Sequence, residues 1–252
     1  MVIQNEKLVE VCGIQRSGNH AMINWIISQQ KLKTCSLNGI LPGENPWHNN
    51  WGTSYRNFDY WPGKKDKSGE LVPKQLLICS YENRYLGKIS YHQSQLWEKI
   101  GYSKESYSVL ILRDPYNTFA SWFKAGWNVT QEITELWKSY AREFIGETSY
   151  LSTNKVTANF NNWFTSRDYR YQLANALNLE FTDNGLNEVT SHGGGSSFNK
   201  LALNGCARQM KVLERFQEFI DVPAYSKIFQ DGEIRELSEI IFGVIEGTEV
   251  IE

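Results

Sequence analysis

The sequence predicts an α/β fold in which a central parallel sheet is flanked by helices. Short apolar segments that suit buried parallel strands occur at 8–12, 76–80, 109–112 and 155–160. Segments with helical periodicity alternate with them, at 19–29, 92–100, 116–127, 131–145 and 166–177. A chain of 252 residues can bury a large core, so we expect one domain over residues 1–252.

The first strand, at 8–12, runs into a turn bounded by Gly13 and Gly18, and a helix is expected from Asn19. A strand, a glycine turn and a helix N-terminus together aim backbone N–H groups and the positive end of the helix dipole at one point. Such a point binds phosphate or sulfate. The alternative is a turn that only connects a strand to a helix.

The two glycines have the spacing of the triphosphate-binding loop G-x-x-x-x-G-K-[ST], in which Lys reaches the phosphates and Ser/Thr holds Mg²⁺. Asn19 and His20 stand in the positions of those two residues, so a Mg²⁺-dependent site is poorly supported. The cation and the hydroxyl instead lie inside the loop, at Arg16 and Ser17. The cysteines are widely spaced and no His pair has ligand spacing, so no metal site is expected.

A long irregular stretch, 38–75, separates the first helix from the strand at 76–80. An insertion of this length without secondary structure is usually functional, such as a lid or a substrate-binding loop. It contains six aromatic residues, Trp47, Trp51, Tyr55, Phe58, Tyr60 and Trp61. Aromatic rings stack on sugar or phenol faces, which favours a ring-shaped ligand; the alternative is a small satellite core that fastens the insertion.

The strand at 109–112 leads directly into a second candidate anion site. Asp114 suits an N-cap and Pro115 the first helical position, so Arg113 lies at the carboxyl edge of the sheet, where open α/β folds bind ligands. A guanidinium there can hold a phosphate through two hydrogen bonds. Ser121 follows about two helical turns later and can direct its hydroxyl at the same group. The alternative is an Arg paired with Asp114 and a Ser packed on its own helix.

A glycine-rich loop follows at 191–200, and helices are expected near 205–219 and 233–242. The Gly193–Gly195 run either brings backbone N–H groups close to a nucleotide or forms a flexible loop. Net charge is −2 with Lys and Arg dispersed, which argues against a nucleic-acid partner. There is no charged and apolar leader and no apolar run of membrane-spanning length, so we expect a cytoplasmic protein without a membrane partner.

Taken together, these motifs resemble the sulfotransferases that use 3′-phosphoadenosine-5′-phosphosulfate (PAPS), which have a P-loop NTPase-like fold. In that family a [KR]-S-G-T-T loop holds the 5′-phosphosulfate, and an Arg and a Ser eight residues apart hold the 3′-phosphate. Arg16-Ser17-Gly18 matches the first motif and Arg113 with Ser121 the second, while Asn19 and His20 replace the two threonines. The loop amides bind an anion whatever these side chains are.

Two further segments carry the resemblance. Ser196-Ser197-Phe198 is similar to the T-S-F segment that lines adenine, with Ser197 and Phe198 as the nucleotide contacts. The stretch "MKVLERFQEF" is similar to the closing helix of bacterial and phage members. The basic R-K-G of the cytosolic enzymes is absent, which leaves fewer cations for the 3′-phosphate.

The resemblance implies metal-independent in-line transfer of a sulfuryl group from PAPS to a hydroxyl or amine, leaving adenosine 3′,5′-bisphosphate (PAP). Arg16 would stabilise the developing charge, and a base must take the acceptor proton. Cytosolic members use a strand-end His, where this chain has Tyr81 and Glu82; other branches use a Glu after the first helix. We rank Glu44 first, Glu82 second and His48 third as the base.

The acceptor is expected to be a small molecule, either a carbohydrate or a phenol. Two other functions stay open. One is a nucleotide kinase-like phosphotransferase on a phosphate-loop fold, which would require Mg²⁺. The other is a non-catalytic protein that binds an adenine nucleotide.

Overall fold

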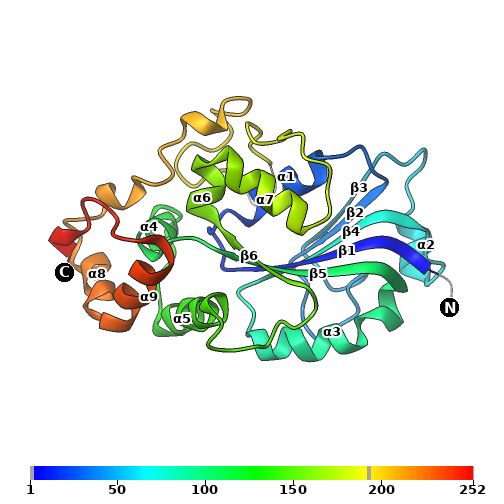
Figure 1. Ribbon diagram of the computed structural model, residues 1–252, viewed down its shortest axis with the longest axis horizontal. Coiled ribbons are helices and arrows are strands. Elements are labelled where there is room, and N and C mark those ends of the chain that lie inside the picture. Colours follow the sequence, from blue (N-terminus) through cyan, green and yellow to red (C-terminus); the bar gives the residue numbers. More distant parts are fainter. Residues whose placement is uncertain (1–2, 192–193, 252) are drawn as a thin grey trace.

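The structure is a computed structural model that describes residues 3–191 and 194–251, and it has one six-stranded sheet with helices on both faces (Figure 1). The strand order is β3-β2-β4-β1-β5-β6, and only β3 is antiparallel to its neighbour. The strands are β1 (Ile3–Gly13), β2 (Thr34–Asn38), β3 (Gly52–Arg56), β4 (Lys74–Glu82), β5 (Tyr102–Leu112) and β6 (Lys155–Asn159). The predicted α/β fold with a parallel sheet is confirmed.

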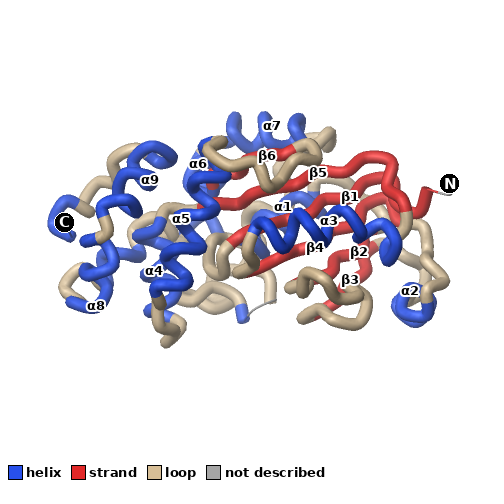
Figure 2. The backbone as a smooth tube through the Cα atoms, turned by 90° about the horizontal axis from the view of Figure 1, so that it is seen from below, coloured by secondary structure: helices blue, strands red, loops and turns tan. Residues whose placement is uncertain are grey.

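The helices alternate with the strands along the chain. Their bounds are α1 (Asn19–Ser28), α2 (Gly63–Ser68), α3 (Leu86–Ile100), α4 (Pro115–Lys124), α5 (Gln131–Ile145), α6 (Phe160–Thr165), α7 (Arg167–Ala176), α8 (Pro223–Ser226) and α9 (Gly232–Phe242). Short 3₁₀ turns are η2 (Ala207–Gln209), η3 (Arg215–Glu218), η4 (Lys227–Gln230) and η5 (Glu249–Ile251). Figure 2 shows the strands side by side, with α4, α5, α8 and α9 at the end of the molecule far from the N-terminus.

Both faces of the sheet are buried, which explains why its strands read as nearly continuous apolar runs. Successive side chains of a strand point to opposite faces. In β1, Leu8 and Cys12 belong to the core formed with α3, α4 and α5, whereas Val9 and Val11 belong to the core formed with α1, α6 and α7. None of the helices in the described part of the chain is long and apolar enough to cross a membrane.

The connections after β1 and β5 create a crevice at the carboxyl edge of the sheet. These two strands are neighbours, yet α1 packs on one face of the sheet and α4 on the other. Loops that leave adjacent parallel strands toward opposite faces open a crevice between them, which is where α/β folds bind ligands. The two motifs with Arg16 and Arg113 therefore lie side by side.

The aromatic insertion at 38–75 differs from the expectation of an irregular segment, because it contains β3 and α2 and begins at the end of β2. Both strands are only five residues long and include several polar residues, so neither has the apolar run expected of a buried parallel strand. The segment is fastened by a fully buried ion pair of 2.9 Å between Lys74 and Asp66. The Tyr55 hydroxyl donates to Asp66 at 2.7 Å, and its ring packs against Trp61. This part of the insertion is a satellite core.

The helix predicted near 205–219 is wrong, because the chain there forms only η2 and η3. Its backbone is held by the side chain of Asn117 on α4, which accepts from Arg215 N at 2.8 Å and donates to Leu213 O at 3.1 Å. The predicted final helix is confirmed as α9. Smaller differences are that α3 begins before residue 92 and that Phe160 opens α6 instead of ending a strand.

Candidate functional site

The loop between β1 and α1 has the backbone conformation of an anion-binding turn. Arg16 and Gly18 both have positive φ, 71° and 88°. A Cβ at Gly18 would lie 2.1 Å from the Phe160 ring, so the close approach requires glycine. No side chain caps α1 and its first turn has no acidic residue. The backbone at the start of this helix therefore offers N–H groups and positive potential to the crevice.

Arg113 and Ser121, which we expect to hold the same anion, lie in contact with each other. Arg113 Nη1 donates to Ser121 Oγ at 3.2 Å and to the carbonyl oxygen of Arg16 at 3.1 Å. Its other terminal nitrogen donates to the carbonyl oxygen of Val212. Asp114 caps α4 by accepting from Asn117 N at 2.7 Å, so the expected N-cap is also confirmed. Arg113 thus connects the phosphate-type loop to α4.

A third arginine, Arg215, which the sequence reasoning did not single out, points at the same place. Its Nη1 donates to Ser121 Oγ at 3.1 Å and its Nη2 to Ser196 Oγ at 3.0 Å. The Ser121 hydroxyl therefore lies between two guanidinium groups. Arg215 sits in η3, within the segment that was expected to be a helix, so its position depends on the fold of that segment and not on local spacing.

Among the described residues, no carboxylate forms an ion pair within 4.0 Å with any of the three arginines. The arginines that form ion pairs within 4.0 Å in the described part of the chain are Arg142 and Arg170, elsewhere in the molecule. Burial lowers the pKa of Arg113 to about 10. Burial, and then repulsion from Arg113 and Arg16, lower the pKa of Arg215 to about 8. Burial therefore disfavours the charged form of both residues, and at Arg215 the neighbouring cations add to this effect.

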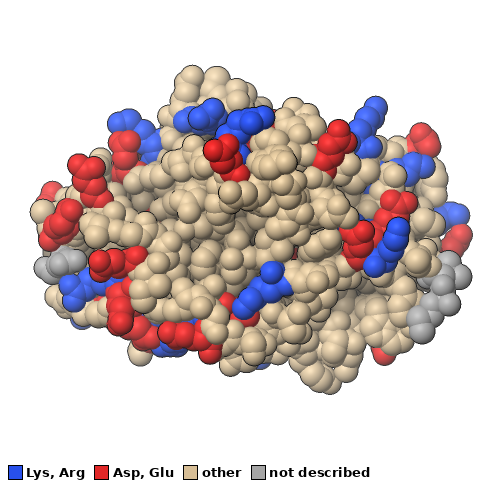
Figure 3. All heavy atoms as spheres, in the orientation of Figure 1, with Lys and Arg blue, Asp and Glu red and all other residues tan. Residues whose placement is uncertain are grey.

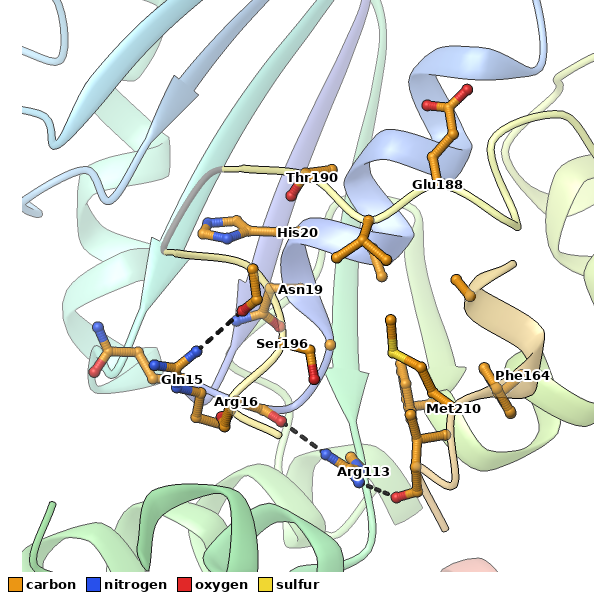
Figure 4. A pocket seen from close by; sticks show the side chains of 18 of the residues that line it. Gln15, Arg16, Asn19, His20, Arg113, Phe164, Glu188, Thr190, Ser196 and Met210 are labelled. Carbon is orange, nitrogen blue, oxygen red and sulfur yellow. Dashed lines mark hydrogen bonds between the residues drawn. The ribbon is translucent and has the colours of Figure 1, made fainter. Parts of the chain in front are cut away.

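These groups line a cavity of about 420 Å³ that has three distinct parts (Figure 4). Arg16, Arg113 and Ser196 lie at its cationic end, together with Arg215. Phe164 and Met210 belong to an apolar wall that also includes Phe160, Leu186, Val189 and Val212. His20 and Thr190 face each other at a polar end. Asn38 and Glu82 lie within 3.5 Å of His20, and the backbone N–H of Trp51 donates to Asn38 O.

A buried carboxylate, Glu82, stands at the polar end because β4 ends there. Asn19 Nδ2 donates to Glu82 Oε1 at 3.1 Å and to the carbonyl oxygen of Ile14 at 3.0 Å. His20 Nε2 lies 3.5 Å from Glu82 Oε1 and 3.2 Å from Asn38 Oδ1. The two residues that replace the family threonines thus hold Glu82 in place beside the loop.

Several predicted site residues are not brought to this cavity. Glu44 is exposed in the insertion and accepts from Asn49, and His48 lines a different cleft on the insertion. Our ranking of Glu44 above Glu82 as the base finds no support, because the turn after β2 directs Glu44 to solvent. Phe198 does not line the cavity, since Arg215 and Lys124 lie over its ring at 4.7 and 5.0 Å.

The serines of the two motifs also separate. Ser197 lines the cavity and its buried hydroxyl has no hydrogen-bond partner among the described residues. Ser17 is fully buried outside the cavity lining, and its backbone N–H donates to Ile14 O at 3.1 Å. His192 and Gly193 of the glycine-rich loop lie outside the described residues, whereas Gly195 lines the cavity. Within the described residues, no three His, Cys, Asp or Glu side chains are grouped to hold a metal ion.

Searches of protein-family models and of curated protein sequences find no match for this chain. Solved structures do match. The sulfotransferase domain of the olefin synthase from Synechococcus PCC 7002 is 12% identical with a TM-score of 0.54, and the match covers 95% of each chain. Mouse sulfotransferase SULT7A1, solved with PAP, is 10% identical with a TM-score of 0.51, over 98% of this chain and 87% of the mouse chain. With its mostly parallel sheet, its loop after β1 and its Arg at the end of β5, this chain has the sulfotransferase fold.

Proposed function

We propose that this protein transfers a sulfuryl group from PAPS to a hydroxyl or amine of an acceptor, without a metal ion. The observation that carries the proposal is the convergence of Arg16, Arg113 and Arg215 on one cavity, with no ion-pair partner for them in the described part of the chain. A nucleotide with phosphate groups at two positions supplies the missing negative charge at both ends of this cluster. The relative solved with PAP is consistent with such a ligand.

The residues present fit the nucleotide. Arg113, Arg215 and Ser121 would hold the 3′-phosphate, and Arg16 with the N–H groups at the start of α1 would hold the 5′-phosphosulfate. The wall that contains Phe164 and Met210 would take the adenine, which needs an apolar, planar environment. The partnerless Ser197 hydroxyl is a polar group that the adenosine could satisfy. Phe198 is not needed in this assignment.

Bound PAPS supplies the sulfuryl group: the acceptor oxygen bonds to sulfur as the bond from sulfur to the bridging phosphate oxygen breaks, which leaves PAP. Arg16 and the loop N–H groups stabilise the negative charge on the departing phosphate. Glu82 takes the acceptor proton, because it lies on the same cavity beside the loop and its Oε1 is fixed by Asn19. His20 orients the carboxylate from the other side.

Two observations weigh against the other candidate functions. A kinase-like enzyme would use the position of Asn19 for a phosphate-binding Lys, whereas Asn19 here holds the loop and Glu82. Burying a carboxylate such as Glu82 costs free energy. Nucleotide binding alone does not require a carboxylate beside the anion loop, whereas proton transfer from an acceptor does.

The test is calorimetry of the full chain with PAP, ADP and ATP, each with and without Mg²⁺, followed by transfer of labelled sulfate from PAPS to an acceptor panel. We expect metal-independent binding that favours PAP over ADP. A preference for Mg²⁺-ATP would instead indicate the kinase-like function, and PAP binding without transfer to any acceptor would indicate a binding protein.

A further inference from the structure

A narrow groove continues from the cavity, with Ile23 and Ile27 of α1 on one side and polar side chains of the edge pair β2–β3 on the other. Its volume is about 40 Å³, and it shares His20, Asn38, Gly52 and Thr190 with the main cavity. Ser36 and Ser54 are direct neighbours in the antiparallel register of the two strands. Their side chains line the groove, whereas Cys35 and Leu37 of β2 face the opposite core.

This groove differs from an ordinary contact between a helix and a sheet. The side of a strand that faces a helix normally carries apolar residues, but here β2 and β3 present hydroxyl, amide and guanidinium groups to α1. The hydroxyls of Ser36, Ser54 and Thr190 hydrogen-bond to no other described residue. Ser36 is nevertheless only 9% exposed. Ser54 and Thr190 are half-buried. Hydroxyls that line a groove without a partner among the described residues suit a ligand that carries several hydrogen-bonding groups.

A chain of hydrogen bonds runs from the groove to the main cavity and offers polar groups to a ligand. Arg56 donates to Asn24 Oδ1 at 2.8 Å, and Asn24 Nδ2 donates to Glu188 at 2.9 Å. Asn24 and Arg56 line the groove beside Ser54, whereas Glu188 lines the main cavity. The buried Asn24 amide is therefore oriented by a hydrogen bond on each side. Preorganised polar groups discriminate strongly against a ligand that cannot pair with them.

An exposed aromatic ring stands where the cavity meets solvent. Trp51 lines the cavity and is 52% exposed. Its ring packs closely on the backbone, because a Cβ at Gly39 would lie 2.2 Å from a Trp51 ring carbon. Its backbone N–H donates to the carbonyl oxygen of Asn38 at 2.7 Å. Trp51 is therefore a fixed and partly open stacking surface.

We propose that the acceptor is a carbohydrate, with one sugar face on Trp51, hydroxyls in the groove and the reacting hydroxyl beside Glu82. This assignment rests on the proposed function and deepens it. The groove admits only a few water-sized groups, so it takes the hydroxyl edge of a ring and not the ring itself. A simple phenol has one polar atom and would leave the groove hydroxyls unpaired, which a binding site penalises.

The experiment uses the full chain with saturating PAP. Its binding to carbohydrates is measured on a printed array of several hundred glycans. Its binding to 4-nitrophenol, 2-naphthol and a tyrosine-containing peptide is measured by calorimetry. We expect retention of a defined group of glycans and no saturable binding of the three phenolic probes. Trp51→Ala should reduce glycan retention at least tenfold, and Ser54→Ala several-fold. Trp97→Ala, which removes another exposed tryptophan far from the cavity lining, is the matched control and should change nothing.

Affinity for PAP separates this inference from the proposed function. All variants should bind PAP as the unaltered protein does, because none of the changed side chains lies among the three arginines. If the unaltered protein does not bind PAP, the sulfotransferase proposal itself is refuted. If PAP binds normally, three results would overturn the carbohydrate assignment alone. These are saturable binding of a phenolic probe, retention of no glycan, and equal retention of glycans by Trp51→Ala and the unaltered protein.

Discussion

Replacing Arg215 with Met tests the arginine cluster through two effects of opposite sign. Lowering the Arg215 pKa from 12.5 to about 8 corresponds to roughly 6 kcal/mol between its charged and neutral forms. Hydrogen bonds to Ser121 and Ser196 and local relaxation offset much of this cost. Replacing buried charges by apolar side chains has stabilised other proteins by about 1–4 kcal/mol. We therefore expect Arg215→Met, without ligand, to be more stable by about 1–2 kcal/mol.

The same change should weaken PAP binding. A hydrogen bond to a charged group contributes about 1.5–3 kcal/mol, so the affinity for PAP should fall about 10- to 100-fold. The affinity for adenosine 5′-phosphate, which lacks the 3′-phosphate, should change little. Urea unfolding and calorimetry measure the two effects, with the exposed Arg208→Met as the control. A variant that is less stable, or that loses both nucleotides equally, would refute a 3′-phosphate role and make Arg215 a structural residue.

Three further predictions concern the base, the insertion and pH. Glu82→Gln should keep PAP affinity within about twofold and lower turnover by about 10²- to 10⁴-fold; retained turnover would return the role to the loop candidates. Asp66→Asn breaks the buried pair with Lys74 and should cost about 3–5 kcal/mol of unfolding free energy, whereas Glu70→Gln in an exposed pair should cost under about 1. Burial lowers the pKa of His92 from 6.5, so the stability contributed by its neutral form is present above that pH and is lost as pH falls below it. Urea midpoints of the unaltered protein and His92→Asn should therefore converge on acidification, and parallel curves would count against this role.

The sequence predicted those parts of the site that depend on local structure. A strand followed by glycines and a helix, and a strand followed by Asp-Pro, fix Arg16 and Arg113 within a few residues of buried strands, so their positions follow from the sheet alone. Arg215 could not be found in this way, because the Asn117 side chain, 98 residues earlier in the chain, positions its backbone. The exposed position of Glu44 could not be predicted for a related reason. It depends on a turn after β2, a strand of five residues that lacks a continuous apolar run.

The departure from the family loop at Asn19 is explained by the same contacts that position Glu82. A threonine at this position could not reach both the carbonyl oxygen of Ile14 and the carboxylate of Glu82, whereas the longer amide donates to both. A Cβ at Gly13 would lie 2.0 Å from Asn19 Oδ1, so the loop needs glycine there to admit this side chain. The residue that removes the Mg²⁺-dependent motif therefore connects the anion loop to the candidate base. We infer that Asn19 and Glu82 form a unit, and that changing Asn19 alone would disturb both the loop and the proton acceptor.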